Sequence, residues 1–196
     1  LANGEFPALW RRPRESVHLL EVIRLRWSFV RQRTQVYNRL QAMAHEVGLR
    51  KGIMRTTRFQ EALKEADMNE VQSLRRDHLF RLMKSLSVQI DEFDLWLKAK
   101  AEEADKVKLL LTQRGVGYLT ALCMVHTVGD VTRFTRTRQI TAFIGLDPLE
   151  RSSGGRVGFG RISKAGSGIL RFLLGQSAHI VTRYDPRLKS FYKRLS

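Results

Sequence analysis

One short stretch of the sequence combines hydroxyl groups, flexible backbone and dense positive charge. The run LERSSGGRVGFGRISKAGSGILRFLL, from Leu149 to Leu174, holds six glycines and four arginines directly ahead of an apolar segment. Glycine buries no side chain and costs backbone entropy, so packing alone does not account for this composition. The residues that could act chemically in this run are Arg151, Ser152, Ser153, Gly154, Gly155, Arg156, Arg161, Ser163 and Lys164.

A serine in this setting could attack a phosphodiester. Its hydroxyl needs activation by a base, a metal or a strongly positive surrounding. Phosphoryl transfer depends mainly on positioning and charge stabilisation, which neighbouring arginines can supply. On spacing alone, a loop that only grips phosphate, with serine as a hydrogen-bond donor, is the stronger interpretation. The run lacks the Gly-x-x-x-x-Gly-Lys-Ser/Thr pattern of a P-loop.

The overall charge points to a polyanionic partner. Thirty-five Lys and Arg residues against 19 Asp and Glu residues give a net charge of +16. Nucleic acid is the first expectation, and a membrane surface the second. No uninterrupted apolar run approaches the roughly 20 residues of a membrane span, so we expect a cytoplasmic protein without a membrane partner. The single cysteine, Cys123, is expected in the core, and the five histidines show no paired spacing for a metal site.

The elements that must position these residues are predicted to be mainly helical. Residues 1–13 read as a linker, and residues 14–106 predict a long antiparallel coiled-coil hairpin. Its first helix runs from Arg14 to Val47 and ends at Gly48; its second runs from Asn69, as N-cap, to about Ala104, with a small helix at the turn. The expected seam residues are Leu20, Ile23, Trp27, Val30, Thr34, Tyr37, Gln41 and Ala44 on the first helix, and Val71, Leu74, Leu79, Leu82, Leu86, Ile90, Phe93 and Leu97 on the second.

Residues 107–196 predict a small helical domain that carries the serine loop. Two apolar helices flank the turn that contains Arg114, Gly115 and Gly117, a pattern typical of a helix-hairpin-helix, in which glycines let backbone approach phosphate. A plain turn between helices is the alternative. A cluster of three arginines precedes the next helix and is expected to bind nucleic acid: Arg133, Arg136 and Arg138. We interpret Asp130 and Asp147 as cap or turn residues.

The segment RGVGYLTALCMVHTVGDVTRFTRTRQITAFIGLDPLERSSGGRVGFGRISKAGSGILRFLL resembles the C-terminal transposase domain of the IS110/IS116/IS902 insertion-sequence transposases. Members of that family carry, in this order, a PGVG-like turn, a GD-x-x-RF segment, a GL-x-P motif, an SSGG-like motif and an ISK-x-GN-x-x-LR motif. The stretch VRQRTQVYNRLQA looks like the region that precedes this domain. Two departures concern Arg114, in place of the usual proline, and Ser167, in place of asparagine.

The resemblance implies DNA strand exchange by a serine that becomes joined to DNA, guided by a bridge RNA, in a dimer or tetramer. By motif position that serine is Ser153, with Ser152 as the near alternative. It also implies an N-terminal RuvC-like domain whose acidic residues bind magnesium; we expect that domain to lie outside this chain, which would then bind nucleic acid but catalyse poorly alone. The rival interpretation is a non-catalytic DNA- or RNA-binding module that uses its hairpin for oligomerisation.

Overall fold

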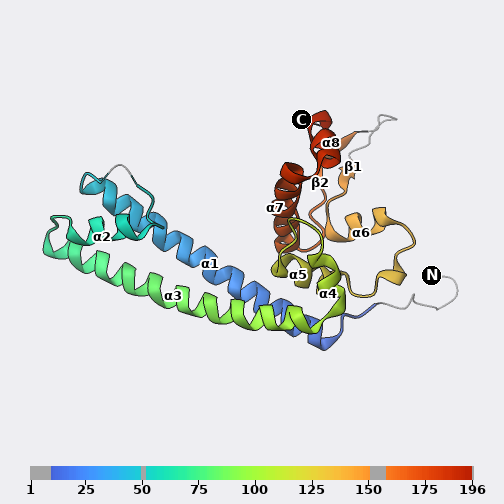
Figure 1. The fold of residues 1–196 in the computed structure, drawn as a ribbon, viewed down its shortest axis with the longest axis horizontal. Coiled ribbons are helices and arrows are strands. Elements are labelled where there is room, and N and C mark those ends of the chain that lie inside the picture. The colour runs from blue at the N-terminus through green and yellow to red at the C-terminus, as the bar shows by residue number, and fades with distance from the viewer. Residues whose placement is uncertain (1–9, 50–51, 151–157, 196) are drawn as a thin grey trace. The chain divides into compact units, whose positions relative to one another are not determined.

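A computed structural model describes residues 10–49, 52–150 and 158–195 and shows a mainly helical chain (Figure 1). The chain divides into two compact units. The hairpin unit comprises residues 24–96, and the C-terminal unit comprises residues 1–23 together with 97–196. Both divisions fall inside long helices. The domain boundaries inferred from the sequence, at 13/14 and 106/107, stay a prediction.

The hairpin unit is built on two long helices that run in opposite directions. They are α1 (Arg14–Glu46) and α3 (Glu70–Glu103), joined through the short helix α2 (Thr57–Glu65). Arg26 of α1 donates to both carboxylate oxygens of Asp94 at 2.8 and 3.0 Å, and Arg33, two turns further on, donates to Ser87 at 3.3 Å. The later residue of α1, Arg33, pairs with the earlier residue of α3, Ser87. The two helices are therefore antiparallel, as the sequence predicts.

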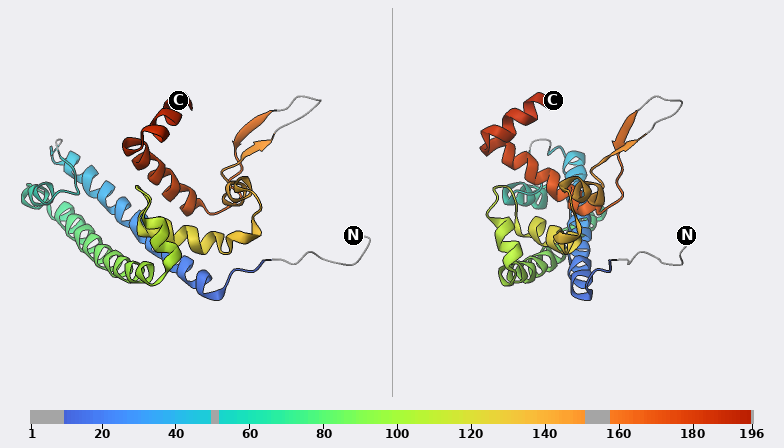
Figure 2. Two further views of the ribbon diagram at one scale, coloured as in Figure 1. Left: turned by 45° about the vertical axis from the view of Figure 1, so that its right-hand side comes forward. Right: turned by 90° about the vertical axis from the view of Figure 1, so that its right-hand side faces the viewer.

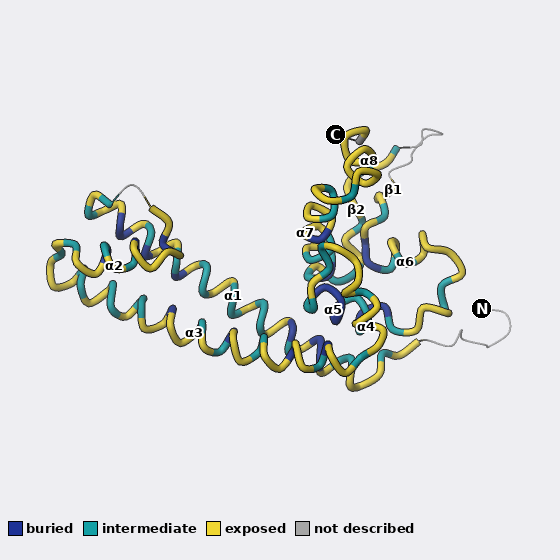
Figure 3. Tube along the Cα trace, in the orientation of Figure 1, coloured by how far each residue is buried: buried dark blue, intermediate teal, exposed yellow. Residues whose placement is uncertain are grey.

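The core of the hairpin unit differs in part from the predicted seam (Figure 3). Val71, Leu74 and Leu82 are 65%, 58% and 46% exposed, so their assignment to the seam is wrong. Apolar residues occupy two neighbouring faces of α3, and only the face with Met83 and Leu86 packs into the core. The buried cluster consists of Val36, Leu40, Ala44, Met54, Phe59, Leu63, Met83 and Leu86.

The start of α3 is capped as its sequence predicts. The Asn69 side chain accepts a hydrogen bond from the backbone N–H of Gln72 at 2.9 Å, and the Gln72 side chain accepts one from the backbone N–H of Asn69 at 3.1 Å. This reciprocal pair satisfies two donors that a helix start leaves without partners.

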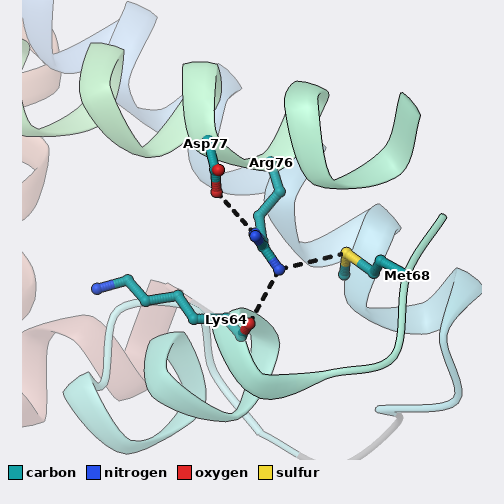
Figure 4. Close-up of polar contacts among 4 residues, drawn as sticks. All are labelled: Lys64, Met68, Arg76 and Asp77. Atoms are coloured by element: carbon teal, nitrogen blue, oxygen red, sulfur yellow. Dashed lines mark hydrogen bonds and ion pairs between the residues drawn. The ribbon is translucent and has the colours of Figure 1, made fainter. Parts of the chain in front are cut away.

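Arg76 ties α2 to α3 (Figure 4). Its Nη1 donates to the carbonyl oxygen of Lys64, in the last turn of α2, at 2.9 Å and lies 3.8 Å from the sulfur of Met68. Its Nε donates to Asp77 at 2.8 Å, and this hydrogen bond lowers the pKa of the Asp77 carboxyl. The arginine therefore satisfies a carbonyl that the helix end leaves free.

The C-terminal unit contains the remaining elements. They are α4 (Asp105–Leu111), α5 (Tyr118–Val128), the 3-10 turn η1 (Val131–Arg133), α6 (Thr137–Ile144), β1 (Pro148–Glu150), β2 (Phe159–Ile162), α7 (Gly168–Tyr184) and α8 (Pro186–Leu195). The start of α1 and the end of α3 contribute Leu19, Leu20, Ile23, Leu97 and Ala101 to the core of this unit. Its other buried members are Val107, Ala121, Leu122, Cys123, Val128, Ile144 and Leu170, which confirms Cys123 as a core residue. No helix in the described part of the chain is both long and apolar enough to cross a membrane.

Candidate nucleic-acid interface

A two-stranded antiparallel ribbon leads into and out of the serine-bearing segment. Strands β1 and β2 lie side by side, with Pro148 opposite Ile162 and Glu150 opposite Phe159 (Figure 2). The sequence analysis treated the serine-bearing segment and the residues beside it as loop. The structure instead places β1 before that segment and β2 after it. Six predicted site residues lie outside the described residues: Arg151, Ser152, Ser153, Gly154, Gly155 and Arg156.

Ser163 and Asp147 fasten the root of the ribbon. The Ser163 hydroxyl donates to the Asp147 carboxylate at 2.6 Å, and the Ser163 backbone N–H donates to the Asp147 carbonyl oxygen at 2.8 Å. Lys164 N–H donates to the Gly145 carbonyl oxygen at 3.2 Å. Ser163, predicted to bind nucleic acid, therefore has its hydroxyl engaged with a carboxylate, and Asp147 is confirmed as a turn residue.

Two glycines let the backbones at this root meet directly. Gly145 ends α6 in the left-handed conformation, at φ 77°. A Cβ on Gly145 would lie 2.5 Å from the backbone nitrogen of Ala165, and one on Gly166 would lie 2.4 Å from the carbonyl oxygen of Phe143. Neither neighbour is a side chain that can turn away, so both positions require glycine.

Arg171 completes this junction, and sequence reasoning gave it no role. Its Nη1 donates to the carbonyl oxygens of Ile144 and Gly166 at 2.9 and 2.8 Å, joining the end of α6 to the turn before α7. The Ser167 hydroxyl oxygen accepts from Leu170 N–H at 3.3 Å and caps α7. Serine therefore fills the capping role that asparagine also fills well.

Two predicted cations of this region are exposed. Arg161 lies on β2 and Lys164 follows that strand; both are open to solvent. Lys164 has φ 57°, in the left-handed region that a non-glycine residue adopts at a cost of order 1 kcal/mol.

Arg133 is half-buried and lies among three aromatic rings. Its guanidinium carbon lies 4.0 Å from the Trp10 ring centroid, 4.1 Å from that of Phe134 and 4.5 Å from that of Phe143. Its Nη2 donates to the carbonyl oxygen of Val128 at 2.9 Å, and burial lowers the pKa of Arg133. Its Nε is buried without a hydrogen-bond acceptor, and the guanidinium makes cation–π contacts with the rings. These contacts are those of a structural residue.

The segment that precedes α1 packs against the end of α5, next to Arg133. Trp10 fills the space above Gly129, where a Cβ would lie 2.4 Å from the indole ring. Arg12 lies 5.9 Å from the Trp10 ring centroid and donates to the carbonyl oxygen of Thr127 at 3.2 Å. Thr127 and Val128 end α5, so two arginines serve carbonyls of one helix end.

Arg136 and Arg138 remain open to solvent at the start of α6. The Gln139 side chain accepts from the backbone N–H groups of Thr135 and Arg136 at 2.8 and 3.3 Å. Since glutamine carries out the capping, the local backbone does not need either guanidinium. These two arginines stay candidates for phosphate contact.

The turn between α4 and α5 contains the remaining predicted residues. Gly115 has φ 84° and fits against α7, where a Cβ would lie 2.8 Å from the carbonyl oxygen of Ser177. Gly117 precedes α5 with open space around it, and Arg114 is exposed, with its guanidinium 5.7 Å from the Tyr184 ring centroid. Gly115 is therefore explained by packing on α7, and the helix-hairpin-helix assignment stays a prediction.

Asp130 and His126 each have a local partner. Asp130 caps η1 by accepting from Thr132, and these hydrogen bonds lower the pKa of the Asp130 carboxyl. His126 meets the Ser16 hydroxyl at 2.9 Å, and burial lowers the pKa of its imidazole. Among the described residues, no three His, Cys, Asp or Glu side chains are placed to hold a metal ion. The donor groups seen here do not fit magnesium.

The region that carries this ribbon is similar to known proteins. Residues 107–193 match the family described as Transposase IS116/IS110/IS902 family. The chain is 32% identical over 170 residues to the transposase for insertion sequence element IS1111A of Coxiella burnetii, an alignment that covers 83% of this chain and 46% of that protein. It is 30% identical over 175 residues to the transposase for insertion sequence element IS1328 of Yersinia enterocolitica, covering 88% and 52%. A probable family 20 transposase of Pseudomonas aeruginosa is 30% identical over 170 residues, covering 82% and 49%. The chain thus spans about half the length of these curated relatives.

Proposed function

We propose, from the premise that residues 107–193 belong to the transposase IS116/IS110/IS902 family, that this chain is the part of a DNA transposase that carries the serine nucleophile. The match across the serine-bearing segment carries the proposal. The ribbon supports it, because β1 and β2 lead into and out of that segment from a root held by backbone contacts.

In the proposed reaction Ser153 attacks a DNA phosphodiester. Its Oγ forms a bond to phosphorus, the bond from phosphorus to one deoxyribose oxygen breaks, and that oxygen takes up a proton while the serine loses one. Arg161, on the ribbon's second strand, and Lys164, which follows that strand, are exposed and hold phosphate oxygens; Arg151 and Arg156 belong to the same proposed cationic set. Positive charge of this kind stabilises the transferring phosphoryl group.

The metal implied by the family resemblance is assigned to the other half of the transposase. The described residues of this chain do not fit magnesium, so no step of the proposal passes through a metal. The proposal also includes a bridge RNA as partner and a dimeric or tetrameric assembly, and both rest on the family resemblance. DNA is the proposed substrate, in keeping with a net charge of +16.

The complete transposase tests the assignment of the nucleophile. Ser153→Ala should abolish strand transfer and the covalent protein–DNA adduct on a nicked substrate, while DNA binding changes less than about twofold because one hydroxyl contributes little to a phosphate-dominated interface. Ser152→Ala is the matched control and should keep the adduct. Loss of the adduct in Ser152→Ala alone would move the assignment to the neighbouring serine. DNA binding without an adduct in the wild-type protein would favour a non-catalytic binding and oligomerisation module.

A further inference from the structure

A pocket opens where the α4–α5 turn meets the corner between α7 and α8. Its volume is about 550 Å³, which is within the range that accommodates a small organic ligand. Thr112, Gln113 and Arg114 form one wall; residue 181 and residues 184–188 form the other. All of these residues belong to the C-terminal unit. The pocket is separate in sequence from the ribbon, and no step proposed above uses it.

An exposed aromatic ring and two guanidinium groups line this pocket. Tyr184 ends α7 with 60% of its surface exposed. Arg114 lies over its ring, 5.7 Å from the centroid, and Arg187, in the first turn of α8, is exposed on the opposite wall. Exposed rings beside arginines are the arrangement by which proteins stack nucleobases and hold the adjoining phosphates.

The charge of the pocket favours an anion. Its one carboxylate, Asp185, accepts hydrogen bonds from the backbone N–H groups of Arg187 and Leu188 at 2.8 and 3.2 Å. That carboxylate therefore caps α8 and is balanced by the positive end of the helix dipole. The charges of Arg114 and Arg187 have no comparable compensation within the pocket wall.

We infer that this pocket binds one nucleotide of a single-stranded nucleic acid, with the base stacked on Tyr184 and the phosphates held by Arg114 and Arg187. A base in an intact duplex is stacked on both faces, so it offers no ring surface to Tyr184; a strand end, a displaced strand or a flipped base does. The inference rests on the proposed function for its class of partner. It adds that this pocket is the place where the chain distinguishes a single strand from a duplex.

The test compares two probes on the chain as it stands. Binding of a fluorescent twelve-nucleotide single strand and of the matching duplex is measured for wild type and for Tyr184→Ala. Loss of one stacking contact should weaken single-strand binding by about 5- to 150-fold, corresponding to about 1–3 kcal/mol, and leave duplex binding within about twofold. Tyr184→Phe keeps the ring and should bind as wild type does. Arg187→Ala should also lower the salt dependence of single-strand binding by about one counterion.

Tyr192→Ala is the matched control, because Tyr192 is a similarly exposed tyrosine on α8 outside the pocket wall. It should bind the single strand as wild type does. Equal single-strand affinity of Tyr184→Ala and wild type, with unchanged helix content by circular dichroism, would overturn the inference. If the wild type bound only the duplex, the inferred single-strand site would be wrong and the proposed function would stand. If it bound neither probe, both would be wrong. An RNA strand of the same sequence shows whether DNA or RNA is the source of the nucleotide.

Discussion

Arginines serve different partners in the two units of this chain. Along the paired helices of the hairpin unit, Arg26 faces the carboxylate of Asp94, and both side chains are only about one-fifth exposed. In the C-terminal unit, Arg12, Arg133 and Arg171 donate instead to main-chain carbonyls. Side-chain pairs suit regular helices that lie next to each other. Carbonyl partners occur where helices stop.

The position of those carbonyls explains the difference. Thr127 and Val128 end α5, and Ile144 ends α6; in each last turn the carbonyl oxygens lack partners within the helix. Arg76 shows the same rule inside the hairpin unit, because it serves Lys64 in the last turn of α2. A short helix has a large share of its residues at its ends, so a unit made of short helices needs more such donors. Part of the +16 charge is thus structural, and a count of arginines overstates the binding surface.

The largest expected effect comes from filling the backbone junction of the C-terminal unit. In Gly166→Ala the new Cβ would lie 2.4 Å from the Phe143 carbonyl oxygen and 2.6 Å from the Ile144 carbonyl carbon. Neither can move without parting α6 from the turn before α7, so the free energy of unfolding should fall by about 3 kcal/mol or more. Hydrogen exchange resolved by unit measures this, and the hairpin unit should keep its protection.

Gly175→Ala is the control for that substitution. Gly175 lies inside α7 with nothing within 4 Å of its Cβ position, so alanine should raise stability by about 0.5–1 kcal/mol. If Gly166→Ala and the wild type showed equal protection from hydrogen exchange in the C-terminal unit, the close backbone junction would not be what holds that unit together. The contrast with the hairpin unit would then fail.

A second, smaller effect should separate structural arginines from binding ones. Arg133→Met keeps a long side chain but removes the hydrogen bond to Val128 and the cation–π contacts, and should cost about 2–3 kcal/mol of stability in urea denaturation. Arg136→Ala removes an exposed side chain and should change stability by less than about 0.5 kcal/mol. In salt titrations of duplex DNA binding, Arg136→Ala should lower the slope by about 0.9, whereas Arg133→Met should not. The reverse pattern would assign Arg133 to the interface.

The smallest effect is expected in the hairpin unit. Asp94→Asn keeps the shape of the side chain and replaces the ion pair with a hydrogen bond from the Arg26 cation to a neutral amide, so the unit should lose about 1 kcal/mol, measured as a shift of its thermal midpoint. A more exposed ion pair, Lys100 and Glu103 near the end of α3 in the C-terminal unit, provides the control, and Glu103→Gln should change stability by only a few tenths of a kcal/mol. A loss as large as that of Arg133→Met would show that both units depend on their arginines equally.

The sequence predicted the elements better than their contacts. Helix starts and stops depend on neighbouring residues, so Asn69 and Gly48 could be recognised as a start and an end. The seam of α3 was partly wrong, because apolar residues on two adjacent faces leave the packed face undecided until α2 is in place. The strands of the ribbon were missed because they are three and four residues long and mostly exposed, which gives no alternation to detect.

The candidate site divides in the same way. Arg161, Lys164, Arg136 and Arg138 were named from charge, and they are exposed. Arg133 was named on the same grounds, yet its guanidinium also contacts Trp10, which lies far away in the sequence, and no local pattern reports such a meeting. Tyr184 was not named, because its significance comes from Arg114, a residue seventy positions earlier.

The pairing of Glu150 with Phe159 has a mechanical meaning. The two paired strands hold the two ends of the intervening segment close together. The entropic cost of closing such a segment grows only slowly as residues are added. Insertions or deletions between those two positions would change how far the connecting segment reaches while the anchorage below stays as it is. Reach and anchorage can therefore vary independently in proteins built on this plan.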